Sequence, residues 1–134
     1  MATPYQDRKI PAPNLNVGDE PYFEGASKGK LMTKYCNNCK KYHHYPRPIC
    51  PLCHSDKTEW REAKGTGTVY SVSVTRAAGP TPYALAYVTL DEGPTMITNI
   101  VDCDLDTIKI GQKVQVTFKP TDDPKVLVPM FKPA

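Results

Sequence analysis

Short stretches with strand-like patterns, divided by proline, glycine and aspartate, dominate the second half of the chain. Val114, Val116 and Phe118 alternate with polar residues, which predicts a strand with one buried face. Further runs rich in β-branched and aromatic residues span 68–76, 83–90, 95–101 and 126–131. Residues 83–90 are apolar on both faces, which predicts a central strand. Five short strands, the first one long, predict a small closed barrel of the OB type, with a five-stranded SH3-like barrel as the competing arrangement.

Turn residues separate these predicted strands. They occur at Gly79-Pro80-Thr81-Pro82, Asp91-Glu92-Gly93-Pro94 and Thr121-Asp122-Asp123-Pro124. Residues 102–111 form an acidic connector with room for a helical turn. The barrel unit is therefore predicted to span residues 64–134.

The first third of the chain has a different pattern. Residues 1–18 contain three prolines and few apolar anchors, which predicts an extended arm that is ordered only where something binds it. A short helix is predicted next: Asp19 or Glu20 faces its amino end, and Gly29 terminates it. Its apolar face carries Tyr22 and Phe23, and so short a helix must dock either on its own domain or on a second protein. These two side chains are the predicted partner-docking residues.

Cysteine spacing supplies the strongest chemical signal. Two C-x2-C pairs, Cys36 with Cys39 and Cys50 with Cys53, lie within 18 residues. Each pair offers two thiolates from one tight turn, and four thiolates complete the tetrahedral shell that structural Zn²⁺ prefers. Residues 19–63 are therefore predicted to form a helix plus a zinc ribbon. Iron in a four-sulfur site remains the chemical alternative, because ligand type alone does not separate it from zinc.

Composition and charge narrow the possible functions. The 134 residues are 40% hydrophobic and 23% charged, as in a soluble globular chain, and no apolar run approaches the roughly 20 residues that span a bilayer. Residues 1–64 carry a net charge of +4 and residues 65–134 carry −1, which does not resemble the basic stripe of a dedicated nucleic-acid binder. Four cysteines used for metal favour a reducing compartment, so the cytoplasm is expected.

The order of these parts resembles a known family, the zinc-ribbon plus OB-fold proteins associated with acyl-CoA enzymes. The resemblance covers about residues 20–134, and the first 18 residues fall outside it. Besides the C-x2-C pairs and Trp60, it rests on the segments Pro21-Tyr22-Phe23-Glu24-Gly25, Tyr45-Pro46-Arg47-Pro48-Ile49, Gly65-x-Gly67-x-Val69-Tyr70-Ser71 and Asp91-Glu92-Gly93-Pro94.

The resemblance implies a mainly β protein with an arm, a short helix, a rubredoxin-like zinc ribbon and an OB-fold barrel. It also implies a non-catalytic partner subunit of a thiolase-fold enzyme that makes or breaks carbon–carbon bonds in acyl-CoA thioesters. The small subunit of benzoylsuccinyl-CoA thiolase has this architecture, although no residue here selects that acyl group. Such subunits stabilise the large subunit and help enclose the coenzyme A channel. The family motif supplies the four metal ligands and no catalytic residue.

Coenzyme A carries phosphates, for which lysine and arginine are charge-assisted donors. Arg47, between two prolines that limit its backbone freedom, is the first candidate, followed by Lys34, Arg61 and Arg76. The competing interpretation of these cations is a solvated basic face. Trp60 is expected to cover one face of the metal site, because the ribbon is too small for its own core.

Other polar residues have less specific interpretations. His43 and His44 are expected on the ribbon surface, and His54 is expected to shape the second knuckle. Cys103 is expected to be a partly buried filler whose pKa is raised by its acidic neighbours.

Two alternative functions remain open from the sequence. Ribbon plus OB barrel is also a nucleic-acid architecture, in which Tyr70, Tyr83 and Tyr87 would stack on single-stranded bases. This alternative lacks electrostatic support, because the barrel half is net acidic. An iron-based electron carrier is the other, and it would be red when oxidised. The acyl substrate, reaction direction and stoichiometry are not specified by any motif.

Overall fold

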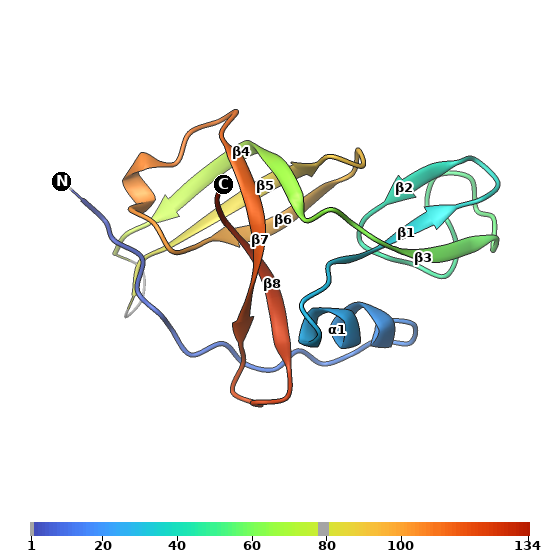
Figure 1. The fold of residues 1–134 in the computed structure, drawn as a ribbon, viewed down its shortest axis with the longest axis horizontal. Coiled ribbons are helices and arrows are strands. Elements are labelled where there is room, and N and C mark those ends of the chain that lie inside the picture. Colours follow the sequence, from blue (N-terminus) through green and yellow to red (C-terminus); the bar gives the residue numbers. More distant parts are fainter. Residues whose placement is uncertain (1, 78–80) are drawn as a thin grey trace.

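The structure is a computed structural model that describes residues 2–77 and 81–134 (Figure 1). One helix precedes two β-sheets, and a short 3-10 turn interrupts the second. The elements are α1 (Glu20–Ser27), β1 (Met32–Cys36), β2 (Lys41–His43), β3 (Thr58–Glu62), β4 (Thr66–Thr75), β5 (Tyr83–Leu90), β6 (Thr95–Ile100), η1 (Leu105–Thr107), β7 (Lys113–Pro120) and β8 (Leu127–Pro133).

Strands β4 to β8 form a closed barrel in the order β4-β5-β6-β8-β7, and β7 also pairs with β4. The last strand, β8, lies between β6 and β7. It runs parallel to β6, where Ile100 pairs with Phe131, and antiparallel to β7. This is the strand arrangement of an OB fold, so the OB prediction is confirmed over the SH3-like alternative. The predicted helical turn in the acidic connector is η1.

Side chains at alternate positions of the strands point inward and fill the barrel interior. Val69, Val88, Ile100, Val114 and Phe131 are buried at its centre. On β5, Ala84, Ala86, Val88 and Leu90 point inward. This strand is central as predicted, because it pairs with β4 and β6. Its other face is not buried, since Leu85 and Tyr87 are exposed.

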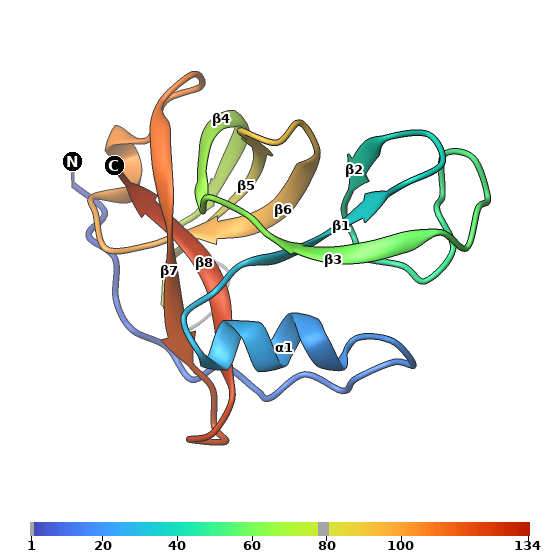
Figure 2. The same ribbon diagram turned by 45° about the vertical axis from the view of Figure 1, so that its right-hand side comes forward.

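The ribbon sheet has the order β2-β1-β3 and continues directly into β4 (Figures 1 and 2). Gly65 makes the connection in the left-handed region, at a φ of 79°. Its carbonyl oxygen accepts a hydrogen bond of 2.6 Å from Val116 N on β7. A side chain at this position would also collide with Val116, which favours glycine here. The ribbon therefore enters the barrel through a tightly packed joint.

Helix α1 packs on both sheets and lies across the joint (Figure 2). It ends as predicted: the amide groups of Lys28 and Gly29 donate to carbonyl groups of the last turn, and Gly29 has a φ of 79°. Ala26 is buried, and Ser27 Oγ accepts a bond of 3.4 Å from Leu127 N on β8. The docking that so short a helix requires is thus provided within the chain.

The N-terminal segment is extended and lies along the barrel (Figure 1). Tyr5 N donates to Cys103 O at 3.0 Å, and Leu105 N donates to Thr3 O at 2.8 Å. Further along, Asp122 N donates to Ile10 O at 2.8 Å. The barrel itself supplies the binding surface on which the order of this segment depends.

The predicted break at Gly79-Pro80-Thr81-Pro82 falls partly outside the described residues, which do not include 78–80. Within residues 2–77 and 81–134, none of the helical segments combines the length and the apolar character that crossing a membrane requires.

Candidate metal centre

The two C-x2-C turns have the same backbone geometry. In the first turn Lys40 N donates to Cys36 O at 2.8 Å, and in the second His54 N donates to Cys50 O at 2.8 Å. Lys40 and His54 both adopt a left-handed conformation, with φ of 58° and 64°. Each turn therefore reverses the chain directly after its second cysteine. His54 shapes the second knuckle, as the sequence predicted.

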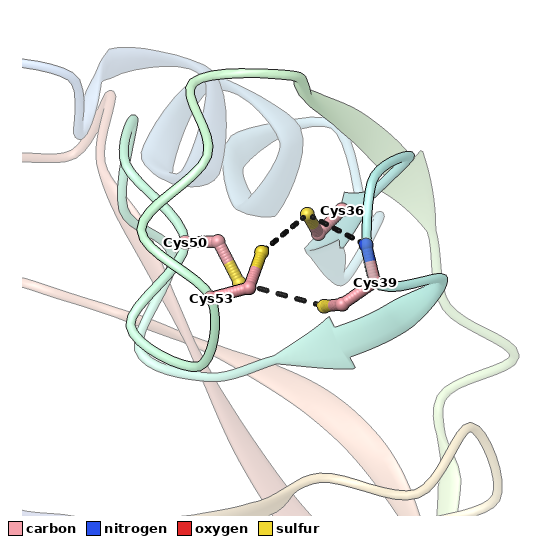
Figure 3. Close-up of side chains that lie close together, drawn as sticks. All are labelled: Cys36, Cys39, Cys50 and Cys53. Carbon is pink, nitrogen blue, oxygen red and sulfur yellow. Dashed lines mark hydrogen bonds between the residues drawn. The ribbon is translucent and has the colours of Figure 1, made fainter.

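The turns bring four sulfur atoms together (Figure 3). All four Sγ atoms lie within 4.8 Å of one another, and no other metal-binding cluster of this kind occurs in the described residues. The distance is 3.5 Å between the sulfur atoms of Cys36 and Cys53 and 3.8 Å between those of Cys39 and Cys50. A tetrahedron with zinc–sulfur bonds of about 2.3 Å has edges of about 3.8 Å. The cluster therefore has the dimensions that a tetrathiolate zinc site requires.

Three of the four sulfur atoms accept hydrogen bonds from nearby N–H groups. Cys36 Sγ accepts from Cys39 N at 3.5 Å, and Cys50 Sγ accepts from Leu52 N at 3.4 Å. Asn38 Nδ2 donates to Cys53 Sγ at 3.5 Å, and this bond leads the effects that lower the pKa of Cys53 to about 6. Asn38 was not singled out from the sequence, although a polar residue inside a C-x2-C turn is a usable signal.

The closeness of the four cysteine thiols opposes ionisation of all of them unless a cation is bound. Burial and then the neighbouring thiols raise the pKa of Cys39 to about 12. Four adjacent thiolates are therefore stable only beside a multivalent cation, which fits structural zinc. Four protein ligands also close the coordination shell, so the site serves folding and does not present a position for water or substrate.

Lys34 does not lie on a solvated basic face, which was the competing interpretation of the candidate cations, and its role in coenzyme A binding stays a prediction. Only 8% of the residue is exposed. Its Nζ lies 4.7 Å from the centre of the Trp60 ring and 3.4 Å from Thr58 Oγ1. Burial lowers the pKa of Lys34. Trp60 thus stacks on Lys34 and packs against the core cluster.

The other three candidate cations do not form one site. Arg61 lies 3.7 Å from the centre of the Tyr35 ring and bonds to Glu59 at 2.7 Å. Arg76 pairs with Asp106 at the far end of the barrel, and Thr3 and Arg76 lower the pKa of that carboxyl. Arg47 is exposed, and its guanidinium forms no ion pair or hydrogen bond with the described residues. Its backbone N donates to His43 Nε2 at 3.2 Å.

The histidine pair is not ribbon surface, which corrects the sequence prediction. His43 is 4% exposed. His44 packs between Tyr22 and Tyr45, with ring centres 5.8 Å and 5.5 Å away. Burial, and secondarily His43, lowers the pKa of His44 to about 4. The aromatic content of α1 explains this burial, because the helix covers this part of the ribbon.

Tyr22 is likewise not an exposed docking residue. It is 5% exposed and contacts Phe23 and Tyr45, with ring centres 5.0 Å and 5.6 Å away. Phe23 is only partly buried and stays a predicted docking residue. Cys103 is partly buried, and burial followed by Asp104 and Asp102 raises its pKa, as its neighbours predicted.

Replacement of Cys36 with serine is expected to abolish stoichiometric metal binding and to unfold the ribbon, because the tetrathiolate shell loses one ligand. Elemental analysis by mass spectrometry and circular dichroism measure the two effects. Cys103→Ser is the matched control and should keep one metal ion per chain. A Cys36→Ser protein with full metal content and unchanged unfolding would contradict the assignment. The metal identified in the parent protein decides between zinc and iron.

Acidification is expected to reduce the free energy of unfolding through His44. The unfolded chain takes up this proton near pH 6.5 and the folded chain near pH 4, so the unfolded state binds more protons as the pH falls through this window. Between pH 7.5 and pH 5 the loss is about 2 kcal/mol. Denaturant titrations measure it against His44→Phe, which removes this contribution and keeps any loss caused by the cysteines. Equal pH slopes for the two proteins would refute the prediction.

Two known family models match this chain, one over the ribbon and one over the barrel. Residues 23–59 match the family model of the ChsH2 rubredoxin-like zinc ribbon domain, and residues 60–119 match that of the ChsH2 C-terminal OB-fold domain. The chain is 38% identical over 128 residues to a "Probable enoyl-CoA hydratase alpha subunit" of Thermomonospora curvata. That alignment covers 92% of this chain and 40% of the relative, so this chain spans less than half the length of that relative.

Shorter relatives and solved structures agree. A DUF35 domain-containing scaffold protein of Methanocaldococcus jannaschii is 37% identical over 96 residues, which cover 66% of this chain and 67% of the relative. A chain of the Ltp2-ChsH2(DUF35) aldolase superposes with a TM-score of 0.78 at 36% identity, covering 91% of this chain and 98% of that one. A DUF35 protein of unknown function from Sulfolobus solfataricus has the same fold, with a TM-score of 0.64 at 16% identity over 89% of this chain and 87% of that one.

These matches confirm the resemblance drawn from the sequence motifs. The chain belongs to the ChsH2/DUF35 family, in which a rubredoxin-like zinc ribbon is joined to a C-terminal OB-fold domain.

Proposed function

We propose that this protein is a non-catalytic, zinc-binding scaffold subunit of an enzyme complex that acts on acyl-CoA thioesters. The observation that carries the proposal is the match, over 91% of the chain, to the ChsH2 component of an aldolase. Relatives described as scaffold proteins and as an enoyl-CoA hydratase subunit support the same class of role. Acting as a scaffold, the chain would stabilise the catalytic subunit and position the thioester.

The scaffold function requires a catalytic partner subunit. We propose a thiolase-fold large subunit, on the family resemblance of the motifs around Tyr22, Cys36 and Gly65. A thiolase or an aldolase reaction fits this partner, and cleavage of benzoylsuccinyl-CoA is one member of the class. In this arrangement the arm (residues 1–18), the helix with the ribbon (19–63) and the barrel (64–134) are separate functional parts. The reducing cytoplasm is the compartment that suits a tetrathiolate site.

The chain's own residues would contribute structure and charge. Zinc held by Cys36, Cys39, Cys50 and Cys53 would supply cross-linking, since four thiolates leave it no open coordination position. The barrel would wall part of the coenzyme A channel and exclude water, which favours productive orientation of the thioester. Arg47 is the cation proposed to bind a coenzyme A phosphate, because Lys34, Arg61 and Arg76 have partners within the chain.

Single-stranded nucleic-acid binding is the second candidate, and the exposure of Tyr70 and Tyr87 on the barrel favours it. No residue of their strands is charged, however, and binding to a polyanion depends on cations. Titration with oligonucleotides across a salt series tests it. Tight binding with a steep salt dependence would support this candidate against the scaffold function.

The isolated protein is expected to have no acyl-CoA cleavage activity, whereas the complex purified from the native organism should be active. Mass spectrometry of the complex identifies the catalytic subunit, and a spectrophotometric assay of coenzyme A release measures turnover with and without it. Turnover by the isolated chain would overturn the non-catalytic assignment. Purification without any acyl-CoA enzyme would overturn the scaffold assignment.

Arg47→Ala is expected to weaken coenzyme A binding to the complex by about tenfold, because one charge-assisted hydrogen bond to a phosphate is lost. Isothermal titration of the complex measures the dissociation constant. Arg76→Ala is the matched control, since Arg76 is already paired with Asp106 at the distant end of the barrel, and its affinity should stay unchanged. Equal affinity of the Arg47→Ala and parent complexes would return Arg47 to the solvated-face interpretation.

A further inference from the structure

Three neighbouring barrel strands contain no charged residue. Strands β4, β5 and β6 consist only of apolar, hydroxyl, glycine and asparagine residues, in a chain that is 23% charged. The other two barrel strands carry Lys113, Lys119 and Lys132. The three uncharged strands lie side by side, on the side of the barrel away from α1 (Figures 1 and 2).

Their outer side chains form one continuous surface, here termed the uncharged face. On β5, Tyr87 pairs with Ser71 of β4 and with Ile97 of β6, and the next outward residue, Leu85, pairs with Ser73 and Asn99. Tyr70 extends the face at an irregularity of β4. The large side chains are open to solvent: the exposed fractions are 68% for Tyr70, 48% for Tyr87 and 51% for Ile97. The uncharged face consists of Tyr70, Ser71, Ser73, Leu85, Tyr87, Ile97 and Asn99.

The surface is hollowed beside Tyr87. A cavity of about 280 Å³ opens there, lined by Ser71, Val72, Ser73, Leu85, Ala86 and Tyr87. It offers a place for an apolar side chain of a partner, next to hydroxyl groups for hydrogen bonding. Strand β5 is paired along both sides, whereas β4 pairs with β7 only over Thr66 to Thr68 and β6 pairs with β8 only at Ile100. A partner that contacts the outer side chains of β5 must therefore dock on the face itself.

Charges gather at the margin of the uncharged face. Arg8 lies 4.7 Å from the centre of the Tyr83 ring, where β5 begins. Lys113 Nζ donates to Thr68 Oγ1 at 3.0 Å, near the start of β4, and Asp91 bonds to Thr66 there. An apolar centre depleted of charge and enriched in tyrosine, inside a charged rim, is the composition of a protein–protein interface.

The chemistry of the face selects its occupant. Nucleic acids and the phosphates of coenzyme A need cations, which β4, β5 and β6 do not offer. A charged partner surface would lose its hydration here without gaining a counter-ion. The complementary partner is a protein surface that is itself apolar and uncharged.

We propose that the uncharged face is the surface by which the barrel docks on an uncharged, apolar patch of the acyl-CoA enzyme subunit. This rests on the proposed scaffold function, which supplies the partner. Tyr87 and Ile97 are the anchors, because they are cross-strand neighbours at the centre of the uncharged face, and the cavity lies beside Tyr87. It differs from the predicted docking role of Tyr22, which is buried within the chain.

The test compares two isoleucines that are both exposed. Ile97 lies on the uncharged face, whereas Ile110 is 71% exposed in the connector after η1. Ile97→Lys buries a charge in the interface and is expected to weaken binding to the co-purified enzyme subunit at least thirtyfold. Ile110→Lys should bind as the parent protein does. Surface plasmon resonance measures the dissociation constants, and metal content and thermal unfolding establish that each variant is folded.

Photo-crosslinking is a second test, and it does not require a variant with weakened binding. Tyr70→p-benzoylphenylalanine places a photo-crosslinker on the face, and Val17→p-benzoylphenylalanine places one on the arm, at a residue that is 94% exposed. Irradiation of the complex should link position 70, and not position 17, to the enzyme subunit. Equal affinity of the Ile97→Lys and parent proteins overturns the proposal, as does crosslinking of position 70 only to a second copy or to an oligonucleotide. If the parent protein binds no acyl-CoA enzyme at all, the scaffold function itself fails.

Discussion

The approach of four cysteine sulfur atoms is the constraint on which the rest of this structure depends. The ribbon sheet has three short strands, of which β2 has only three residues, and cannot enclose a hydrophobic core of its own. The two knuckles replace that core, because they bring Cys36, Cys39, Cys50 and Cys53 within reach of a single ion. A metal bound there links segments that would otherwise be free to move independently.

Rigidity at the ribbon matters because the ribbon is continuous with the barrel. Strand β3 leads through Gly65 into β4, and α1 packs against both β1 and β8. Burial of Tyr22, Ala26 and Leu31 at this junction joins the two sheets through apolar contact. A protein built in this way presents its surfaces in fixed positions relative to one another, which is what a scaffold requires. Strand β5 is paired with a neighbour on both sides, so recognition at this strand falls to its side chains.

The distribution of charged side chains fits a scaffold role. Most cations considered for ligand binding are engaged inside the chain: Lys34 on Trp60, Arg61 on Tyr35 and Arg76 with Asp106. Arg47 is exposed on the ribbon, and the uncharged face lies on the barrel. The ribbon and barrel therefore offer two chemically different surfaces, one suited to an anionic group and the other to an apolar protein surface.

The amino-acid sequence by itself determined the elements whose signals are local. The C-x2-C spacing predicted both knuckles, Gly29 marked the end of α1, and alternation along the strands predicted the OB barrel, because each depends on residues close together in the chain. Only the tertiary structure decided which side chains are buried. Tyr22 and His44 cover one another from segments some twenty residues apart, and Leu85 and Tyr87 lie on the open side of a strand whose two faces are equally apolar. Sequence periodicity distinguishes the faces of a strand, but the packing of distant segments determines which face meets solvent.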